Sequence, residues 1–204
     1  MTSFPEEFLS VVLVDDGSDP SCGPLFARLA AFPGVTLLRH AVNLGKGNAL
    51  KTGLNDVLCR FPNAAGAVTA DADGQHTPAD IRRIAGLLDA GAADLILGAR
   101  RFSRGVPLRS LVGNRTILLL FRLLVGRRLS DTQTGLRGIS SRIIPQLLRI
   151  EHSGYEFELD MLIMSKHHDW SIAETNIETV YVDGNRSSHF RPLRDSIHIS
   201  LQLF

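Results

Sequence analysis

Two carboxylates separated by one residue are the groups in this chain best suited to bind a cation. They lie in the segment Asp71-Ala-Asp73-Gly-Gln75, directly after an apolar run. Asp71 and Asp73 can converge on one hard cation, and the Gln75 amide oxygen can be a further ligand. Such oxygen ligands suit Mg²⁺ or Mn²⁺, which keep open positions for a substrate's phosphates. The alternative is a solvated turn that caps the helix beginning at Pro78.

A second acidic pair lies earlier in the chain, in the segment Asp15-Asp16-Gly17-Ser18. Either carboxylate can accept hydrogen bonds from a nucleotide base or from ribose hydroxyls. The alternative is an ordinary cap between a strand and a helix, where Asp and Ser are preferred. Both acidic pairs follow predicted strands, and this shared position favours a ligand site over two unrelated caps.

The segment Asn43-Leu-Gly-Lys46-Gly47-Asn48 opens a predicted helix with two glycines and a lysine. Its backbone N–H groups and the Lys46 ammonium could approach a diphosphate. The segment is not a Walker P-loop, because His40 and Gly47 stand where that pattern needs Gly and Ser or Thr. The alternative is a simple loop that leads into a helix.

Strand-like and helix-like segments alternate through the first half of the chain. The predicted strands are Phe8–Val14, Val35–Leu38, Ala64–Ala70 and Asp94–Gly98, and the predicted helices are Leu25–Phe32, Asn48–Phe61 and Pro78–Leu88. This rhythm predicts an α/β fold with a mostly parallel sheet and helices on both faces. Ligands of such sheets bind at the carboxyl ends of the strands, where both acidic pairs fall.

The second half of the chain begins with a basic, loop-rich stretch, Arg100–Arg115. The later predicted elements are a helix at Thr116–Val125, a polar segment at Ser130–Gly135, a helix at Glu156–His168 and strands at Ile177–Val182 and 197–204. Glu156 and Glu158 could touch a sugar or a metal, but a solvated helix face is the favoured interpretation.

The composition is that of one soluble domain. The chain has 204 residues with 22 basic and 21 acidic side chains, and this balance argues against a broadly basic nucleic-acid-binding protein. Cys22 and Cys59 are too few for a disulfide framework and fit a reducing compartment. The most apolar run, 116–125, is interrupted by Arg122 and falls short of the roughly 20 residues that cross a membrane. With no signal peptide in the sequence, we expect a cytoplasmic protein.

Together these motifs resemble the family 2 glycosyltransferases of the GT-A fold, in the branch of dolichol-phosphate mannose synthases and bacterial polyprenyl-phosphate sugar transferases. The matching segments are Val11–Ser18, Asn43–Ala49, Asp71–His76, Gly98–Arg100, Ser130–Gly135, Tyr155–Leu159 and Asp183–Arg191. Each is weak alone, but their order and spacing are specific.

The resemblance implies a single GT-A domain over residues 1–204, with a nucleotide- and metal-binding half at 1–99 and an acceptor half at 100–204. Family members begin with a further strand and helix before the equivalent of Phe8–Val14. Because only seven residues precede Phe8, we expect this chain to lack that unit.

The resemblance also implies roles on the donor side. Asp71, Asp73 and Gln75 match the positions that gather the metal on the nucleotide diphosphate. Asp15 or Asp16 would hold the base, and Lys46 and Asp71 would lie near the same nucleotide.

On the acceptor side, Arg100 and Arg109 match positions that grip a lipid phosphate, which planar guanidinium groups suit. Asp131, Gln133 and Thr134 match sugar or acceptor contacts. The catalytic residues would then be Asp73, Arg100 and Arg109.

The implied reaction is inverting transfer of a sugar from a nucleotide-diphosphate sugar to a dolichyl or undecaprenyl phosphate, with Mg²⁺ or Mn²⁺ as cofactor. A lipid monophosphate is largely ionised at neutral pH, so it can attack without a general base. Catalysis would rest on alignment and on the metal.

The implied partners are the donor, the lipid phosphate and a membrane surface or membrane-embedded protein, with no nucleic acid. We expect a peripheral position on the cytoplasmic face of the membrane. The helix at Thr116–Val125 could lie among lipid headgroups or be buried against the sheet. Two alternatives stay open: a truncated, non-catalytic nucleotide-binding or scaffold subunit, and a sugar nucleotidyltransferase.

Overall fold

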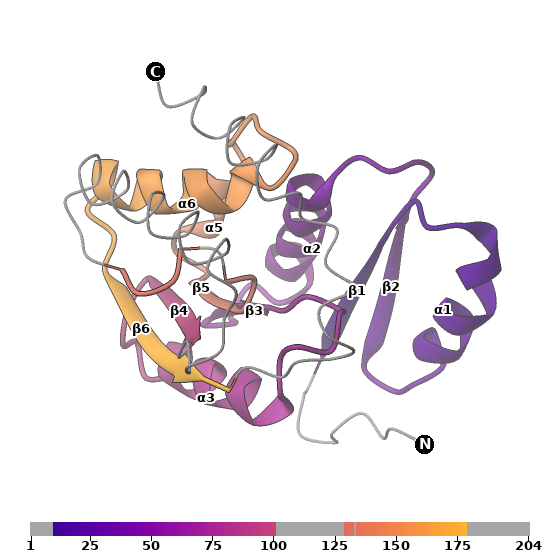
Figure 1. The fold of residues 1–204 in the computed structure, drawn as a ribbon, viewed down its shortest axis with the longest axis horizontal. Helices are drawn as coiled ribbons and strands as arrows, with labels where there is room; N and C mark the ends of the chain where they lie inside the picture. Colours follow the sequence, from indigo (N-terminus) through magenta and orange to yellow (C-terminus); the bar gives the residue numbers. More distant parts are fainter. Residues whose placement is uncertain (1–9, 101–128, 133, 179–204) are drawn as a thin grey trace, which may run out of the picture.

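Strands and helices alternate up to residue 100, and later strands complete the same architecture (Figure 1). The computed structural model describes residues 10–100, 129–132 and 134–178. The strands are β1 (Val11–Asp16), β2 (Val35–His40), β3 (Gly66–Thr69), β4 (Leu95–Arg100), β5 (Arg137–Ser140) and β6 (Ile172–Ile177). The helices are η1 (Pro20–Cys22), α1 (Gly23–Ala30), α2 (Lys46–Arg60), α3 (Pro78–Asp89), α5 (Ile144–Leu147) and α6 (Glu156–His167).

The described strands form two sheets. β1 and β2 pair in parallel, and the larger sheet has the strand order β3-β5-β4-β6. β5 runs antiparallel to both β3 and β4, whereas β6 runs parallel to β4. Consequently β3 and β4 end, and β5 begins, at the same edge of the sheet.

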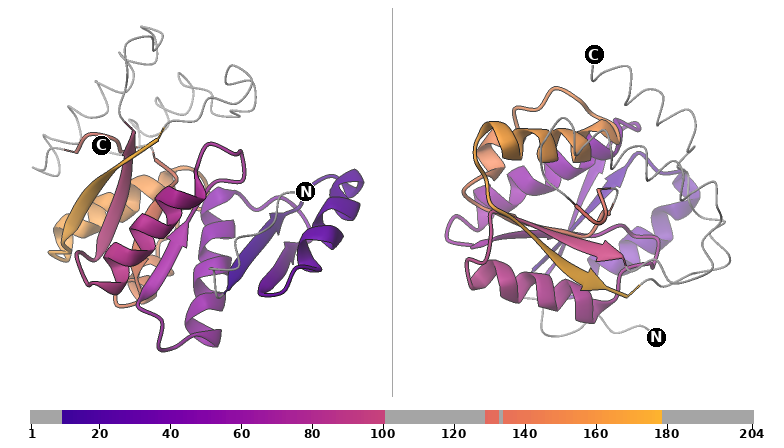
Figure 2. Two further views of the ribbon diagram at one scale, coloured as in Figure 1. Left: turned by 90° about the horizontal axis from the view of Figure 1, so that it is seen from below. Right: turned by 60° about the vertical axis from the view of Figure 1, so that its left-hand side comes forward.

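Helices cover both faces of the four-stranded sheet (Figure 2). On one face α3 packs Ile84 and Leu88 against the strands. On the other face α5 and α6 form the larger core, which includes Phe157 and is joined by Leu54 of α2. α2 also packs against β1, so it connects the large sheet to the β1–β2 pair (Figure 1). The result is a three-layer arrangement.

The connection from β3 to α3 carries the first acidic motif and is fixed at its helical end. The Thr77 hydroxyl accepts a hydrogen bond from the Asp80 N–H at 3.1 Å, and Pro78 occupies the first turn of α3. This cap and the preset φ of proline define where the helix starts, and therefore where the loop after β3 must end.

The predicted α/β class is confirmed, with β5 as the strand that departs from the parallel arrangement. The helices predicted at 48–61, 78–88 and 156–168 correspond to α2, α3 and α6. β5 itself was not predicted, because Arg137 and Gly138 interrupt the apolar alternation of a strand.

The observed strand begins before the one predicted at Ile177–Val182: β6 runs from Ile172 to Ile177, and residues 179–182 of the predicted strand lie outside the described residues. Glu174 and Asn176 are exposed on β6, whose only strand partner among the described residues is β4. These polar positions give β6 the composition of a loop rather than of a buried strand.

Several expectations fall outside the described residues. They include the helix at 116–125, the strand at 197–204 and everything before Ser10, so the expected loss of the family's first strand and helix stays a prediction. Across the part of the chain that the structure describes, no helix has both the length and the apolar character that crossing a membrane requires.

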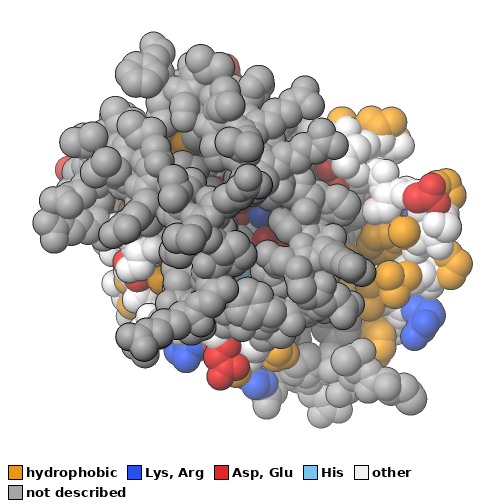
Figure 3. Space-filling view, in the orientation of Figure 1, with side chains coloured by type: hydrophobic (Ala, Val, Ile, Leu, Met, Phe, Trp, Pro, Cys, Tyr) orange, Lys and Arg blue, Asp and Glu red, His pale blue; other side chains and the backbone are white. Residues whose placement is uncertain are grey.

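The β1–β2 part of the molecule is less buried than the large sheet. β4 has Leu95, Ile96 and Leu97 completely buried, whereas β1 and β2 are mostly half-buried along their length. Hydrophobic side chains gather on this side of the surface in Figure 3, and Leu25 of α1 is 53% exposed.

Candidate functional site

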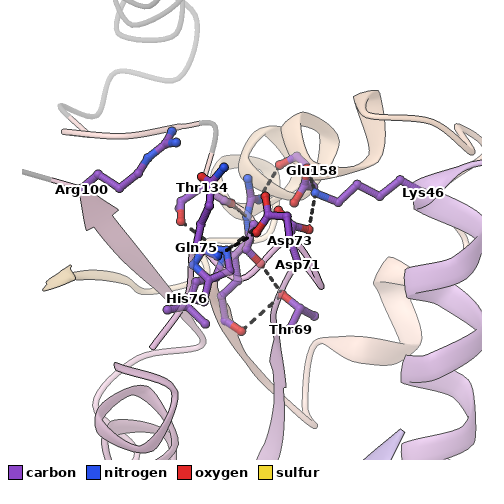
Figure 4. Close-up of polar contacts among 12 residues, drawn as sticks. Lys46, Thr69, Asp71, Asp73, Gln75, His76, Arg100, Thr134 and Glu158 are labelled. Atoms are coloured by element: carbon purple, nitrogen blue, oxygen red, sulfur yellow. Dashed lines mark hydrogen bonds and ion pairs between the residues drawn. The ribbon is translucent and has the colours of Figure 1, made fainter. Parts of the chain in front are cut away.

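The candidate site lies at the edge of the large sheet where β3 and β4 end and β5 begins. Asp71 and Asp73 follow β3, and Arg100 is the last residue of β4. Lys46 reaches the same place from the first turn of α2, and Glu158 from the first turn of α6 (Figure 4). Acidic and basic side chains are visible together near the centre of the face in Figure 3.

Lys46 pairs with two carboxylates. Its Nζ lies 2.8 Å from Oδ1 of Asp71 and 3.1 Å from Oε2 of Glu158, with the Tyr155 ring centroid 5.7 Å away. Burial alone would lower the pKa of Lys46, but Glu158 and Asp71 outweigh this effect and raise it. Burial would likewise raise the pKa of Asp71, yet His76 and Lys46 hold it well below its ordinary 3.8. Lys46 and Asp71 are therefore both charged at neutral pH.

Asp73 and His76 lie on either side of the turn after β3. Oδ1 of Asp73 accepts a hydrogen bond from the Gln75 N–H at 3.0 Å, which fixes the turn. Nε2 of His76 lies 3.9 Å from Oδ2 of Asp71. Nδ1 of His76 is buried and has no hydrogen-bond partner among the described residues. A buried nitrogen of this kind is an atom that a ligand or a water is expected to satisfy.

The donor set fits a Mg²⁺ or Mn²⁺ ion that is shared with a substrate. Within the described ranges, no group of three or more His, Cys, Asp or Glu side chains is arranged to hold a metal. Asp71, Asp73 and Gln75 lie close together after β3 (Figure 4) and carry the hard oxygen atoms that we expected to bind the ion. One or two carboxylates completed by substrate phosphates is the usual way in which Mg²⁺ is held in phosphate-processing sites.

Gly135 allows the segment before β5 to lie directly against Asp71. A Cβ at Gly135 would stand 2.1 Å from Oδ2 and 2.8 Å from Oδ1 of Asp71, so any other residue there would force the Asp71 carboxylate to move. The Gly135 carbonyl in turn accepts a hydrogen bond from the Thr69 hydroxyl at 3.0 Å (Figure 4). The Asp71 carboxylate is thus confined between this segment and Lys46.

Asp16, at the end of β1, is hydrogen-bonded to the backbone of the loop that precedes α2. Its carboxylate accepts hydrogen bonds from the N–H groups of Leu44 and Gly45, both at 2.9 Å, and lies 2.6 Å from Nδ1 of His40. Burial would raise the pKa of Asp16, but these hydrogen bonds outweigh it and lower the pKa. Both oxygen atoms of Asp16 therefore have protein donors.

Asp15 lies beside Asp16 but makes different contacts. Its side chain accepts a hydrogen bond from the Ser18 N–H at 3.0 Å and lies 3.7 Å from Nε of Arg39. Neither Asp15 nor Asp16 contacts the cluster of Lys46, Asp71 and Glu158, which is called the Lys46 cluster below.

Three N–H groups of the loop before α2 and of its first turn already have partners within the protein. We expected its N–H groups to approach a diphosphate, but those of Leu44 and Gly45 donate to Asp16, and that of Asn48 donates to the Ser153 carbonyl at 3.1 Å. The group that this loop brings to the site is the Lys46 ammonium.

Arg100 is held by Asp131. Nε and Nη2 of Arg100 donate to the two carboxylate oxygens at 2.6 and 3.2 Å. The Asp131 side chain is completely buried, whereas the Arg100 side chain is 26% exposed. Thr134 is also buried, and its hydroxyl accepts a hydrogen bond from the Leu136 N–H at 3.3 Å. Arg109 and Gln133, the other expected acceptor residues, lie outside the described residues.

Arg137 is a residue of the site region that the sequence analysis missed. Its fully buried guanidinium donates to the backbone carbonyls of Thr132, Thr134 and Glu158, at 3.1, 2.9 and 2.6 Å. Burial lowers the pKa of Arg137, and the nearby carboxylates, Glu158 first among them, oppose this effect. Only recognition of β5 as a strand would have placed this arginine under the site.

The favoured expectation for Glu158, a solvated helix face, is wrong. Glu158 is 8% exposed and pairs with Lys46. Helical spacing could not reveal this, because Phe157, Met161 and Leu162 make α6 buried over a wide arc that includes the neighbouring Glu158.

The chain is similar in sequence to known glycosyltransferases. The profile of glycosyl transferase family 2 matches residues 3–143. The chain is 29% identical over 194 residues to a UDP-N-acetylglucosamine–dolichyl-phosphate N-acetylglucosaminyltransferase of Methanococcus voltae, which covers 85% of this chain and 76% of the relative. It is 31% identical over 175 residues to the polyprenol monophosphomannose synthase of Mycolicibacterium smegmatis, covering 82% of this chain and 65% of the relative.

Solved structures share the fold. Glucosyl-3-phosphoglycerate synthase from Mycobacterium tuberculosis, in complex with Mn²⁺, UDP and glucosyl-3-phosphoglycerate, matches with a TM-score of 0.66 and 20% identity over 95% of this chain. The match spans 67% of that enzyme's chain, and the same enzyme has been solved with Mn²⁺ and UDP-glucose. With the family profile covering residues 3–143, the chain belongs to glycosyl transferase family 2 and is a glycosyltransferase.

Proposed function

We propose that this glycosyltransferase moves a sugar, with inversion, from a nucleotide-diphosphate sugar to a polyprenyl phosphate on the cytoplasmic face of a membrane. The observation that carries the proposal is the placement of Asp71, Asp73 and Lys46 and of the Arg100–Asp131 pair at one edge of the same sheet. The relatives that act on dolichyl phosphate and polyprenol support the choice of acceptor.

The donor side is formed by the Lys46 cluster. Asp71 and Asp73, with the Gln75 amide, would hold Mg²⁺ or Mn²⁺, and Lys46 would lie beside the nucleotide. Asp15 or Asp16 would contact the base. The low pKa of Asp71 supports this assignment, because an ionised carboxylate needs no deprotonation before it binds a cation.

The acceptor side is formed by Arg100, with Arg109 as its expected companion. A guanidinium whose Nε and Nη2 are fixed by Asp131 is preorganised for a phosphate, because little of its side-chain freedom remains to be lost. Burial of Asp131 favours a role in positioning Arg100 over direct contact with the sugar. Thr134 and Gln133 would complete the region.

The chemistry requires no protein base. An ionised oxygen of the acceptor phosphate attacks the anomeric carbon on the side opposite the diphosphate, and the bond from that carbon to the donor's phosphate oxygen breaks. The electron pair of the broken bond leaves with the nucleoside diphosphate, and no proton moves. A bound divalent ion supplies charge stabilisation on that leaving group. The protein's own contribution is alignment of the two reactants, which can lower a barrier by roughly 7–11 kcal/mol.

The test is release of nucleoside diphosphate. The purified chain is incubated with Mn²⁺, a short-chain polyprenyl phosphate and a panel of UDP- and GDP-sugars. We expect one donor to release nucleoside diphosphate in the presence of the lipid phosphate but not of the matching polyprenol. Asp73→Asn should reduce this rate at least about a hundredfold, since it removes a ligand of the charge-stabilising ion.

Other results would redirect the assignment. Pyrophosphate as the product would identify a nucleotidyltransferase, and transfer to 3-phosphoglycerate in place of the lipid would replace the acceptor. A folded chain that releases nothing from any donor, or an Asp73→Asn variant with unchanged rate, would contradict the proposal.

A further inference from the structure

The Lys46 ammonium binds the carboxylate of Asp71, to which a metal ion would also bind. It lies 2.8 Å from Oδ1 of Asp71, the carboxylate to which the proposed function assigns the cation. The second oxygen of Asp71 faces His76 at 3.9 Å and the Gly135 backbone, so the carboxylate has little room to turn away from Lys46. A divalent cation that binds Asp71 must therefore compete with the ammonium for the same carboxylate.

Glu158 provides Lys46 with a second carboxylate. Oε2 of Glu158 lies 3.1 Å from the ammonium, and the Glu158 side chain is only 11% exposed. An ammonium that lost Asp71 and had no other acidic partner would be a poorly compensated charge in a largely buried place, which is costly. With Glu158 present, the same ammonium stays paired after Asp71 is taken.

The backbone around this pair is rigid enough to hold it. Gly47 packs so tightly against the start of α6 that an added Cβ would meet Cβ of Phe157 and the Ser153 backbone, both at 2.8 Å. Nζ of Lys51 donates to the carbonyls of Ile150 and His152 at 2.9 and 3.1 Å. These contacts fix the first turn of α2 against the start of α6, so Lys46 and Glu158 keep their relative positions when Asp71 changes partner.

We infer that Lys46 holds the place of the cation in the metal-free protein and that Glu158 is the positioning residue that retains Lys46 when a divalent cation takes Asp71. This inference rests on the proposed function, since it requires a cation at Asp71. In the cation-bound protein, Glu158 neutralises the ammonium next to the ion and keeps it beside the nucleotide. Glu158 therefore acts on cation binding through Lys46 and not as a ligand.

The test is a double-mutant cycle on the Mn²⁺ affinity of the substrate-free protein, followed by the EPR signal of free Mn²⁺. The variants are Lys46→Met, Glu158→Gln and the double substitution, each checked for folding by circular dichroism. Lys46→Met should bind Mn²⁺ about fivefold more tightly, because a competing cation has been removed. Where Lys46 is present, Glu158→Gln should weaken Mn²⁺ binding about fivefold or more. In the Lys46→Met background the same substitution should weaken it at most about twofold. The difference between these two effects is the coupling between Glu158 and Lys46, and its size is in the range measured for charged neighbours.

Two results overturn the inference. Equal weakening by Glu158→Gln in both backgrounds would show that Glu158 acts on the ion directly, and unchanged or weaker Mn²⁺ binding by Lys46→Met would show that Lys46 does not compete. Should Glu158→Gln fail to fold, Glu158→Asp, whose shorter side chain withdraws the carboxylate from Lys46, takes its place in the cycle.

A control variant separates this inference from the proposed function. Asp73→Asn reports whether Mn²⁺ binds at the Asp71 site at all. If wild-type protein binds no Mn²⁺, or if binding does not depend on Asp73, the metal assignment fails and the inference fails with it. If binding depends on Asp73 while the cycle is additive, only the inference fails.

Discussion

At the scale of single residues, the site depends on one carboxylate with several neighbours. Asp71 is paired with Lys46, faces His76 and is confined by Gly135. The hydrogen bond from His76 and the charge of Lys46 lower the free energy of the ionised form more than burial raises it, which is why the pKa of Asp71 lies below 3.8. Under the proposed function, the same neighbours that keep the carboxylate ionised would also control the binding of a metal ion to it.

The low pKa of Asp71 predicts a pH dependence of stability. Because the folded-state pKa is depressed, the unfolded chain binds the proton more readily, so the contribution of Asp71 is fully present above pH 3.8 and is lost as pH falls through the folded-state pKa. Urea unfolding of metal-free wild type and Asp71→Asn at several pH values measures this. The difference in unfolding free energy should be constant near neutrality and shrink below about pH 4. A difference that stays constant down to pH 3 would contradict it.

At the scale of elements, the sequence predicted the helices and strands next to the candidate site residues better than it predicted the arrangement of the large sheet. α2 has a clear apolar stripe, α3 has a clear start signal at Pro78, and the strand before Asp71 is a short apolar run. β5 has none of these signals, since a buried arginine and a glycine lie where a strand normally places apolar side chains. Its place between β3 and β4 depends on tertiary packing, and no local pattern encodes that.

The same limit applies to the site. Asp71, Asp73 and Lys46 could be selected from motif spacing, and the structure brings them to one sheet edge. Glu158 and Arg137 could not, because their importance comes from contacts with residues far away in sequence. The buried pairing of Asp131 with Arg100 is equally invisible in the sequence.

Because Gly135, in the segment before β5, lies directly against Asp71 at the end of β3, we expect its substitution to reduce metal binding. Gly135→Ala should displace the Asp71 carboxylate, because the new Cβ would lie 2.1 Å from its Oδ2. We expect Mn²⁺ affinity to fall about tenfold or more, which corresponds to about 1.4 kcal/mol. Calorimetric titration of the folded variant with Mn²⁺ measures it.

Gly86→Ala is the matched control, because a Cβ at that helical position meets nothing within 4 Å. It should leave Mn²⁺ affinity unchanged and raise stability by roughly 0.5–1 kcal/mol, as Ala does relative to Gly in helices. Equal Mn²⁺ affinities for Gly135→Ala and wild type would contradict the placement of Asp71.

At the scale of the whole molecule, the buried side chain of Arg137 connects the region around Lys46 and Glu158 with the region around Arg100 and Asp131. Its guanidinium connects the segment at Thr132 and Thr134, next to the Arg100–Asp131 pair, with α6, which carries Glu158. The proposed donor side and the proposed acceptor side therefore share one buried anchor. Such an arrangement keeps two reacting groups at a fixed separation, and alignment of the reactants is what the proposed chemistry requires.

This anchor predicts a large loss of stability on substitution. Arg137→Met fills a similar volume but removes a hydrogen-bond donor from each of three buried carbonyls, so we expect a loss of about 2–5 kcal/mol in the free energy of unfolding. Denaturant titration measures it, with exposed Arg149→Met as a control that should change stability by less than about 0.5 kcal/mol. Similar losses for both variants would contradict the role of Arg137.

The most direct test of the whole account is the identity of the transferred product. The chain is incubated with Mn²⁺, polyprenyl phosphate and a donor labelled in its sugar, and the mixture is extracted with organic solvent. The account predicts that label appears in the organic phase as a glycosyl phosphate lipid, in amounts equal to the nucleoside diphosphate formed, and that Asp73→Asn yields none. Label that remains in the aqueous phase with every donor, while the chain is folded, would contradict it.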